Sequence, residues 1–281
     1  MRIEFKSLLV GAGILVLASS LWGQKGQPAG PKPKSNKEVA ALNAINAAPT
    51  VDDKLKAIDN VLTNFKDTEF RPMLLDMALQ LEAQKGDYAQ VMTYGELILD
   101  KDPKNASALV TMAGETARRT REFDLDKDEK LAKADKWAKQ GIEDAKTFPK
   151  PPGTSLTDEQ WEHTKLDLQS QGYEALGMSA AVNKKYDDAV ANFKQALALS
   201  PTAGTWLRLG QAYEDGGKFD DANDAFDKAG AMPNASAQIK TIAANKKAEV
   251  AKLKAGAAAK PPAGTQPPAA PGAQPPAAAQ H

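Results

Sequence analysis

Three aspartates at alternate positions form the pattern in this sequence that most resembles a site for chemistry. Asp124, Asp126 and Asp128 have the opening spacing of a calcium-binding loop, in which carboxylate oxygens bind the ion. The later positions depart from that pattern, because Glu129 stands where the turn needs glycine and Asp135 stands where a bidentate glutamate is usual. We therefore interpret the segment as a solvated acidic connector and expect no metal site.

Candidates for nucleophilic or acid-base catalysis are few. Of the two histidines, one is His281, and the other, His163, is expected to face solvent beside glutamates. No serine lies in a nucleophile elbow, and no glycine-rich phosphate loop follows a strand. The 281 residues include no cysteine, so thiol catalysis, zinc-thiolate sites and disulfides are excluded. We expect no catalytic residue and no cofactor, and an enzyme is the least favoured of three hypotheses.

The charges of the chain argue against a nucleic-acid partner. Lysine and arginine together number 36, and so do aspartate and glutamate, so the net positive field that attracts phosphates is missing. A small basic cluster, Arg118, Arg119 and Arg121, precedes the acidic connector, and we expect the two to screen each other. Lysines between Lys240 and Lys254 are interpreted as a solvated helix face.

Residues 1–23 have the layout of a secretory signal peptide. Arg2 and Lys6 precede an uncharged, mostly apolar run over residues 7–22, and small residues near its end favour cleavage after Ser20 or Gly23. The alternative is an uncleaved N-terminal anchor with membrane association through residues 7–22, because the run is nearly long enough to span a bilayer. Either interpretation predicts an exported protein that is periplasmic or associated with the cell envelope.

Composition divides the rest of the chain into three parts. Residues 24–37 are rich in lysine and proline and predict a flexible linker, because they can bury little apolar surface. Residues 255–281 are mostly alanine, proline, glycine and glutamine and predict a disordered tail. Residues 38–254 between them are expected to form a helical domain.

Helical patterns follow one another along this domain, and no convincing strand appears. A capping box at Thr157 and Gln160 predicts the start of a long helix that runs to about Asn183. About ten extra residues, Thr120 to Glu129, separate the two helices of the third pair. The other expected helices are Asn36–Ala47, Asp52–Phe65, Pro72–Lys85, Asp87–Asp100, Ala106–Arg119, Glu129–Ala145, Thr205–Asp215, Asp220–Ala229 and Ser236–Lys254.

A pattern of seven residues recurs after 33 positions in the last third of the domain. It consists first of Tyr173, Leu176, Gly177, Ala189, Phe193, Ala196 and Pro201, and then of Trp206, Leu209, Gly210, Ala222, Phe226, Ala229 and, one position early, Pro233. Tyr213 adds a further aromatic residue to the second copy. A repeat of this length is typical of stacked helical hairpins.

These residues resemble the tetratricopeptide repeat over about residues 36–235, strongly in the last third and weakly in the first. The resemblance implies an all-α, right-handed solenoid of about five helix-turn-helix repeats with a C-terminal capping helix. Gly177 and Ala189 are expected to face each other within one hairpin so that the backbones approach closely. Tyr173 and Phe193 are expected to fill the space between neighbouring hairpins.

The resemblance also implies that the first helix of each pair lines a concave groove for an extended or helical peptide. The set of groove positions is small, apolar and slightly acidic, and it lacks the lysines and asparagines that clamp a peptide's terminal carboxylate in some family members. An acidic C-terminal ligand is therefore disfavoured. The candidate groove residues are Gln80, Val110, Glu174, Met178, Leu207, Gln211 and Glu214.

Two hypotheses for function follow from the repeats and the leader. The first is a non-catalytic, exported scaffold that binds a protein or peptide partner through its groove. The second is a membrane-tethered structural or assembly factor of the envelope, with the N-terminal helix retained.

Overall fold

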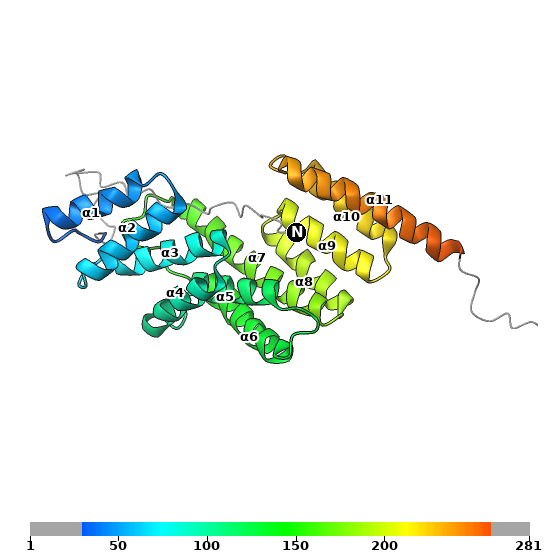
Figure 1. Cartoon of the computed structure of the whole chain (residues 1–281), viewed down its shortest axis with the longest axis horizontal. Helices are drawn as coiled ribbons and strands as arrows, with labels where there is room; N and C mark the ends of the chain where they lie inside the picture. Colours follow the sequence, from blue (N-terminus) through cyan, green and yellow to red (C-terminus); the bar gives the residue numbers. More distant parts are fainter. Residues whose placement is uncertain (1–29, 260–281) are drawn as a thin grey trace, which may run out of the picture.

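The computed structural model describes residues 30–259, which form eleven helices and no strand (Figure 1). The expectation of an all-α fold is confirmed. The helices are α1 Asn36–Ala47, α2 Val51–Asn64, α3 Arg71–Lys85, α4 Tyr88–Lys101, α5 Ala106–Arg119, α6 Lys127–Lys146, α7 Asp158–Val182, α8 Tyr186–Leu199, α9 Ala203–Asp215, α10 Phe219–Ala231 and α11 Ala237–Ala259.

Local sequence signals account for where these helices begin. The side chains of Ser35, Thr50, Asp87 and Asn105 each accept a hydrogen bond from a backbone N–H in the first turn of the helix that follows. The predicted capping box is present at the start of α7, which runs for 25 residues. Because these bonds involve residues next to one another in the chain, the helix starts can be read from the sequence.

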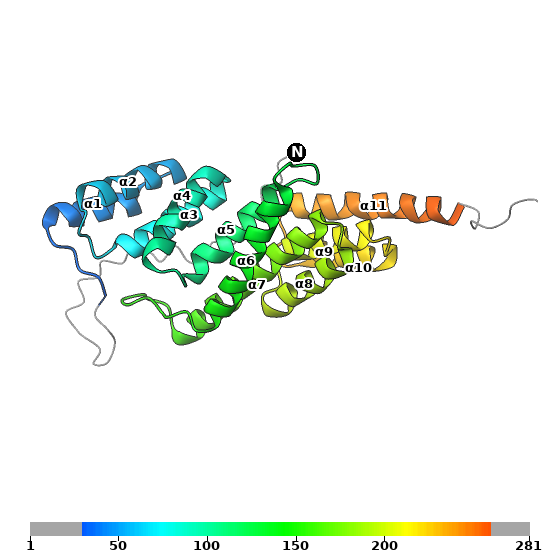
Figure 2. The same ribbon diagram turned by 90° about the horizontal axis from the view of Figure 1, so that it is seen from below.

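The helices pack in consecutive pairs to form an elongated stack (Figure 1). Each helix contacts the next along the chain, from α1 and α2 at one end to α10 and α11 at the other. Figure 2 shows α11 lying over α9 and α10 and extending past them. The five pairs form a solenoid, and α11 covers its last pair, as expected for a capping helix.

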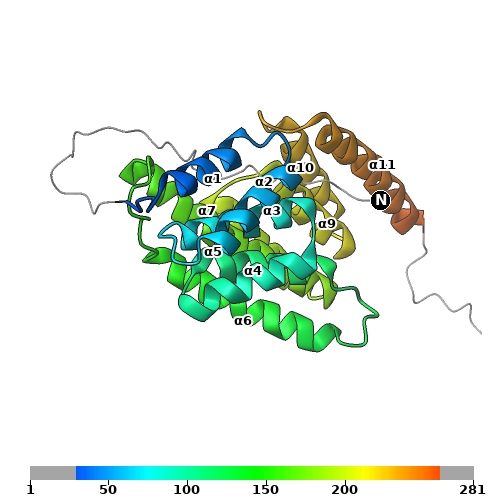
Figure 3. The same cartoon turned by 60° about the vertical axis from the view of Figure 1, so that its left-hand side comes forward.

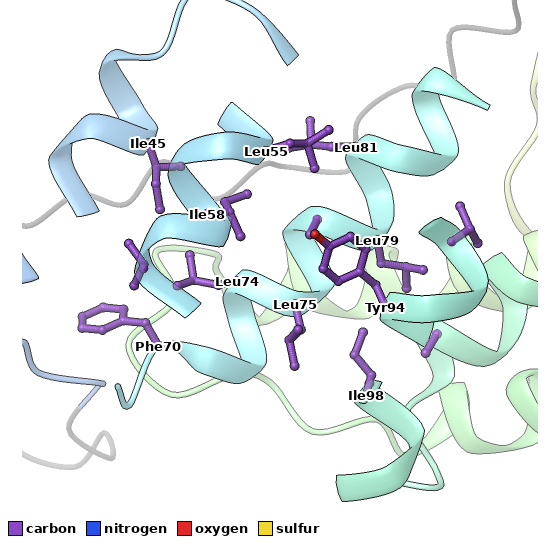
Figure 4. Packing of buried hydrophobic residues seen from close by; sticks show 14 of the residues in the cluster. Ile45, Leu55, Ile58, Phe70, Leu74, Leu75, Leu79, Leu81, Tyr94 and Ile98 are labelled. Carbon is purple, nitrogen blue, oxygen red and sulfur yellow. The ribbon is translucent and has the colours of Figure 1, made fainter. Parts of the chain in front are cut away.

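The first two pairs share one core, in which α1, α2, α3 and α4 each contribute side chains (Figure 4). Ile58, Leu74 and Leu79 are completely buried there. A second large cluster holds the last pairs and includes Phe193 and Phe226. Each cluster draws residues from more than one pair, so a single hairpin would lose part of its core if it were isolated.

Glycine allows the last two hairpins to close around an aromatic ring. A Cβ atom placed on Gly177 would lie 2.6–2.9 Å from three ring carbons of Phe193, and one on Gly210 would lie 2.4–2.9 Å from those of Phe226. The ring of Phe193 therefore lies against Gly177 of its own hairpin, and it belongs to a core that also includes residues of the next hairpin. A side chain at position 177 would overlap the edge of that ring.

The second hairpin has a large residue where the later hairpins have glycine, and glycine where they have phenylalanine. Leu79 stands at the repeat position of Gly177, and Gly95 stands at that of Phe193, with the same spacing within each pair. Leu79 is buried, and the atoms nearest to a Cβ on Gly95 belong to Met112 of the next pair. This exchange explains why the repeat pattern is weak here although the helices still stack.

Most predicted repeat residues lie in the interior. Gly177, Ala189, Phe193, Ala196, Leu209, Gly210, Tyr213, Ala222, Phe226 and Ala229 are buried, Tyr173, Leu176 and Trp206 are half-buried, and Pro201 is exposed. Pro201 is therefore the one member of the first copy of the pattern that lies at the surface. It follows α8, which ends at Leu199, and it disfavours further helix there.

Some predicted boundaries need correction. Residues 30–35 are not a free linker, because Lys32 N–H donates to Glu69 (2.9 Å) and the Lys34 ammonium donates to the Asp67 carbonyl (2.6 Å). The first residues of the predicted tail, 255–259, continue α11. The predicted signal peptide or anchor, residues 1–23, lies outside the described residues. Within residues 30–259, no helix combines the length and apolar character needed to cross a membrane.

Substitution of a single glycine tests the packing of the repeat. We expect Gly177→Ala to lower the free energy of unfolding by about 1–3 kcal/mol, because the added methyl group overlaps the buried Phe193 ring. The matched control is Gly114→Ala in α5, where no atom lies within 4 Å of the new Cβ. That variant should be more stable than the wild type by up to about 1 kcal/mol. Urea unfolding of both variants measures the difference, and equal effects would contradict the assignment.

Candidate partner-binding surface

The first helices of successive pairs form one continuous layer along the stack. Helices α3, α5, α7, α9 and α11 each contact the next member of this series, whereas α2, α4, α6, α8 and α10 make no such contacts with one another. In a curved stack, helices that are two apart in the chain come into contact only on the concave side, which is the shorter one. This layer, which we call the inner layer, is therefore the concave side, and α1 alone among the first helices does not join it.

Polar side chains connect α3 to α5 within the inner layer. Gln80 donates from its amide nitrogen to the hydroxyls of Ser107 and Thr111, both at 3.1 Å. The Ser107 hydroxyl in turn donates to Asp76 at 2.6 Å. The predicted groove residue Gln80 is half-buried and joins two repeats, so its amide nitrogen is engaged within the protein.

Polar contacts also connect the first helices of later repeats. Glu174 of α7 accepts a hydrogen bond from the Thr205 hydroxyl and forms an ion pair with Arg208 of α9 at 3.4 Å. Glu214 of α9 forms an ion pair with Lys246 of the capping helix α11, also at 3.4 Å. The carboxylates predicted for a groove therefore hold successive first helices together.

Three of the seven predicted groove residues, Val110, Leu207 and Glu214, are buried and need correction. Val110 is 1% exposed and packs against Ala145 and Leu168 between α5, α6 and α7. Leu207 is 6% exposed and belongs to the core of the last pairs. Neither side chain presents a surface to a partner. On a helix in contact with neighbours on several sides, the spacing from Leu109 or Trp206 does not by itself distinguish a groove position from a buried one.

Met178 and Gln211 retain part of their surface on the inner layer. Both are half-buried, and Gln211 donates to Asp215 one turn further along α9 at 2.9 Å. With Gln80 and Glu174 they are the predicted groove residues that keep some exposure, and Glu214 is 7% exposed. Whether a peptide binds there stays a prediction.

Burial changes the acidity of carboxyl groups in the inner layer. Desolvation raises the pKa of Glu214 above its ordinary value, and the ion pair with Lys246 opposes this only in part. Desolvation likewise raises the pKa of Asp76 despite the hydrogen bond from Ser107. These groups carry their charge in the folded protein at a cost, which the lateral hydrogen bonds and ion pairs reduce.

The clearest hollows lie at the edge of the stack where the hairpins turn. One, of about 390 Å³, is lined by Lys184, Lys185, Tyr186, Asp187, Asp188, Gly216 and Lys218. A second of the same volume is lined by Thr120, Arg121, Glu122, Ala181, Val182, Lys184, Tyr186 and Asp215. They share Lys184 and Tyr186, so they adjoin each other. No motif in the sequence indicated this edge.

The residues singled out for chemistry do not converge on a site. Asp124 accepts a hydrogen bond from the Arg121 N–H at 3.0 Å, and Asp126 pairs with Lys130 at 2.9 Å. His163 is exposed on α7. Over residues 30–259, no group of three or more aspartate, glutamate or histidine side chains could hold a metal ion.

The basic residues expected to screen the acidic connector or to face solvent are also used in packing. Arg119 donates to the Gly86 carbonyl and lies over the ring of Tyr88 at 5.6 Å, so it joins two repeats. On α11, Lys247 pairs with Asp227 and Lys254 pairs with Asp220 of α10. Both lysines keep a large exposed surface, so they lie on the expected solvated face and also form ion pairs with α10.

The buried carboxylate of Glu214 predicts a pH dependence of stability. Because its pKa is raised in the folded state, that state binds the proton more tightly than the unfolded chain does. The contribution of Glu214 to stability is therefore lost as the pH rises from the ordinary glutamate pKa, about 4.3, through the raised value. We expect the free energy of unfolding of the wild type to fall relative to that of Glu214→Gln as the pH rises above about 4.3.

Urea unfolding at a series of pH values measures this difference. The matched control is Glu249→Gln, which removes the other carboxylate beside Lys246 (2.9 Å) from an exposed position. Because that control retains the buried carboxyl group of Glu214, its free energy of unfolding should still fall over this pH range. A constant difference between wild type and Glu214→Gln over the whole range would contradict the assignment.

Comparison with known proteins bears on the fold. The sequence matches no protein-family model and no curated protein, whereas 26 chains of solved structures match. One of them is TTC0263, described as a thermophilic TPR protein in Thermus thermophilus. It is 17% identical, has a TM-score of 0.54, and is matched over 74% of this chain and 98% of its own.

Two further structures are more distant. MamA protein is 14% identical with a TM-score of 0.46, over 68% of this chain and 89% of its own. The assembly chaperone of RpL4, Acl4, is 9% identical with a TM-score of 0.36, over 79% of this chain and 97% of its own. Both superpose too loosely to support a conclusion. From the stacked helix pairs and the likeness to TTC0263, the chain has the tetratricopeptide-repeat fold.

Proposed function

We propose that this chain is a non-catalytic, exported scaffold that binds a protein or peptide partner through its inner layer. The observation that carries the proposal is the continuous contact of α3, α5, α7, α9 and α11 along one side of the stack. Such a layer offers an extended surface instead of a single enclosed pocket, which suits a partner that is itself long.

The ion pairs formed by the carboxylates in this layer favour a binding function over a catalytic one. Glu174 and Glu214 are engaged by Arg208 and Lys246. A catalytic acid or base needs a proton that a substrate can reach, and these carboxylates are directed at neighbouring helices. The half-buried Met178 and Gln211 supply apolar and hydrogen-bonding surface without net charge.

Site-directed photocrosslinking in the native cell tests the binding face. A photoreactive residue at Met178 or at Gln211 should form adducts of the same mass, because both positions lie on the inner layer, on the neighbouring helices α7 and α9. The matched control is Gln195, an exposed residue on α8, which belongs to the second helices. Identical adducts from all three positions, or none from Met178 and Gln211, would contradict the proposed face.

Export rests on residues 1–23 and needs a separate measurement. We expect N-terminal sequencing of the protein from its native cell to find a mature chain that starts after Ser20 or Gly23. The matched control is a variant with Leu15→Arg in the apolar run, which should remain unprocessed because a charge interrupts that run. A native chain that begins at Met1 would contradict cleavage and favour a membrane-tethered assembly factor instead.

A further inference from the structure

Two segments far apart in the sequence cross at a pair of glycines. Gly30 precedes α1, and Gly153 lies in the connection between α6 and α7, which Figure 3 shows beside α1. A Cβ atom on Gly30 would lie 2.7 Å from the Cα atom of Gly153, and one on Gly153 would lie 2.6 Å from the Cα atom of Gly30. Because the obstacle on each side is backbone, no rotation of a side chain could relieve the overlap. The two backbones touch here only because both residues lack a Cβ atom.

The segment that precedes α1 is attached to the first two helix pairs. We call residues 30–35 the clasp. Their backbone donates from Lys32 to Glu69, in the connection between α2 and α3, and from Lys34 to Glu38 at 2.6 Å. Glu38 is only 1% exposed in the first turn of α1, and the Lys34 ammonium binds a carbonyl of the same α2–α3 connection. One side of the crossing is therefore fixed to the start of the stack.

The other side of the crossing is fixed to α7. In the connection that contains Gly153, the Phe148 ring lies 5.7 Å from that of Trp161 on α7, measured between centroids. The Trp161 indole N–H donates to the Phe148 carbonyl at 3.0 Å, and Lys150 pairs with Asp158 at 2.9 Å. The connection and the N-terminal end of α7 therefore move together, and a force on Gly153 acts on α7.

The first helix pair has few other attachments to the stack. Among the described helices, α1 contacts only α2, and α2 contacts only α1 and α3. A pair held in this way can turn about the contact between α2 and α3, whereas the later pairs are also held by the contacts between their first helices. The clasp gives the first pair a second attachment, which reaches past the second and third pairs to the connection before α7.

The clasp itself is only lightly held. None of residues 30–35 is buried, and the bonds to Glu69 and Asp67 are exposed to solvent. Segments with little buried apolar surface open locally at a small cost in free energy. Pro31 and Pro33 restrict the segment before it closes, so closing loses less conformational entropy than it would for a chain without proline. These features describe a segment with a closed and an open state.

We propose that the clasp is a closing device that sets the angle between the first helix pair and the inner layer. In the closed state, Gly30 lies against Gly153 and the first pair is held to α7. In the open state, the first pair turns about the contact between α2 and α3. Because the clasp spans the part of the inner layer formed by α3 and α5, its closure fixes the curvature of that part. This inference is independent of the partner proposed for the inner layer.

Distance measurements between two spin labels on the full chain test this proposal. The chain contains no cysteine, so Ala44→Cys on α1 and His163→Cys on α7 provide two unique and exposed labelling positions. We expect one narrow distance for this labelled protein, because the clasp is closed. Adding Gly30→Ala should broaden the distribution and add a longer distance, because the new methyl group overlaps the Gly153 backbone and opens the clasp. Circular dichroism checks that each variant keeps its helices.

Matched variants separate the clasp from unrelated strain. Gly153→Ala should act like Gly30→Ala, whereas Gly217→Ala should leave the narrow distance unchanged. Gly153 and Gly217 have similar positive φ angles, 75° and 73°, but no atom lies within 4 Å of a Cβ on Gly217. Glu69→Ala should also broaden the distribution, because it removes a hydrogen-bond acceptor of the clasp, whereas Glu96→Ala, at an exposed position on α4, should not.

Three results would contradict the proposal. A broad distribution in the labelled parent protein would overturn it, because the clasp would then not hold the first pair. A narrow distance that persists in both Gly30→Ala and Gly153→Ala would overturn it as well. Equal broadening by Gly217→Ala would assign the effect to backbone strain instead of the crossing.

Discussion

The structure depends on how closely two helices can approach when one of them lacks a Cβ atom. Gly177 and Gly210 each accept the edge of a buried aromatic ring from the second helix of the same pair, at distances where no methyl group would fit. Gly141 against Val110 and Gly172 against Ile142 show the same arrangement in the middle of the stack. Glycine thus allows close helix packing within the last two pairs and in the middle of the stack.

Closely packed pairs leave little free surface on the side where the first helices meet. Residues such as Gln80, Glu174 and Glu214 therefore serve first as lateral connections between repeats. The cost of burying their polar groups is reduced because each finds a partner on the next helix. A ligand on this layer would meet a surface already fixed by these contacts, and would gain most from the half-buried Met178 and Gln211.

The edge of the stack where the hairpins turn differs from the inner layer in that it includes a connection longer than the repeat needs. There, the connection between α5 and α6 is longer than the repeat requires, and its charged residues secure it to the neighbouring turn while Phe123 and Leu125 remain in water. The inner layer arises from the repeat itself, whereas this connection is an interruption of the repeat.

The sequence by itself determined the helices and their order. The capping residues Ser35, Thr50, Asp87 and Thr157 act within one turn, and the recurrence of Gly177 and Phe193 as Gly210 and Phe226 indicated stacked pairs. Such interactions join residues close in the chain, so a local pattern suffices to predict them. The match of the second pair is weak because Leu79 and Gly95 stand at the positions of Gly177 and Phe193, and Met112 of the next pair fills the space at Gly95.

Only the tertiary structure decided which of these side chains face a partner. Val110 and Gln80 were both predicted to line the groove, yet Val110 is buried against Ala145 and Leu168 while Gln80 stays half-exposed. Their exposure depends on how α6 and the long α7 cross α5, which no spacing within α5 encodes. The exposed pair Phe123 and Leu125 is likewise apparent only once the chain is folded, because burial is a property of all the neighbours together.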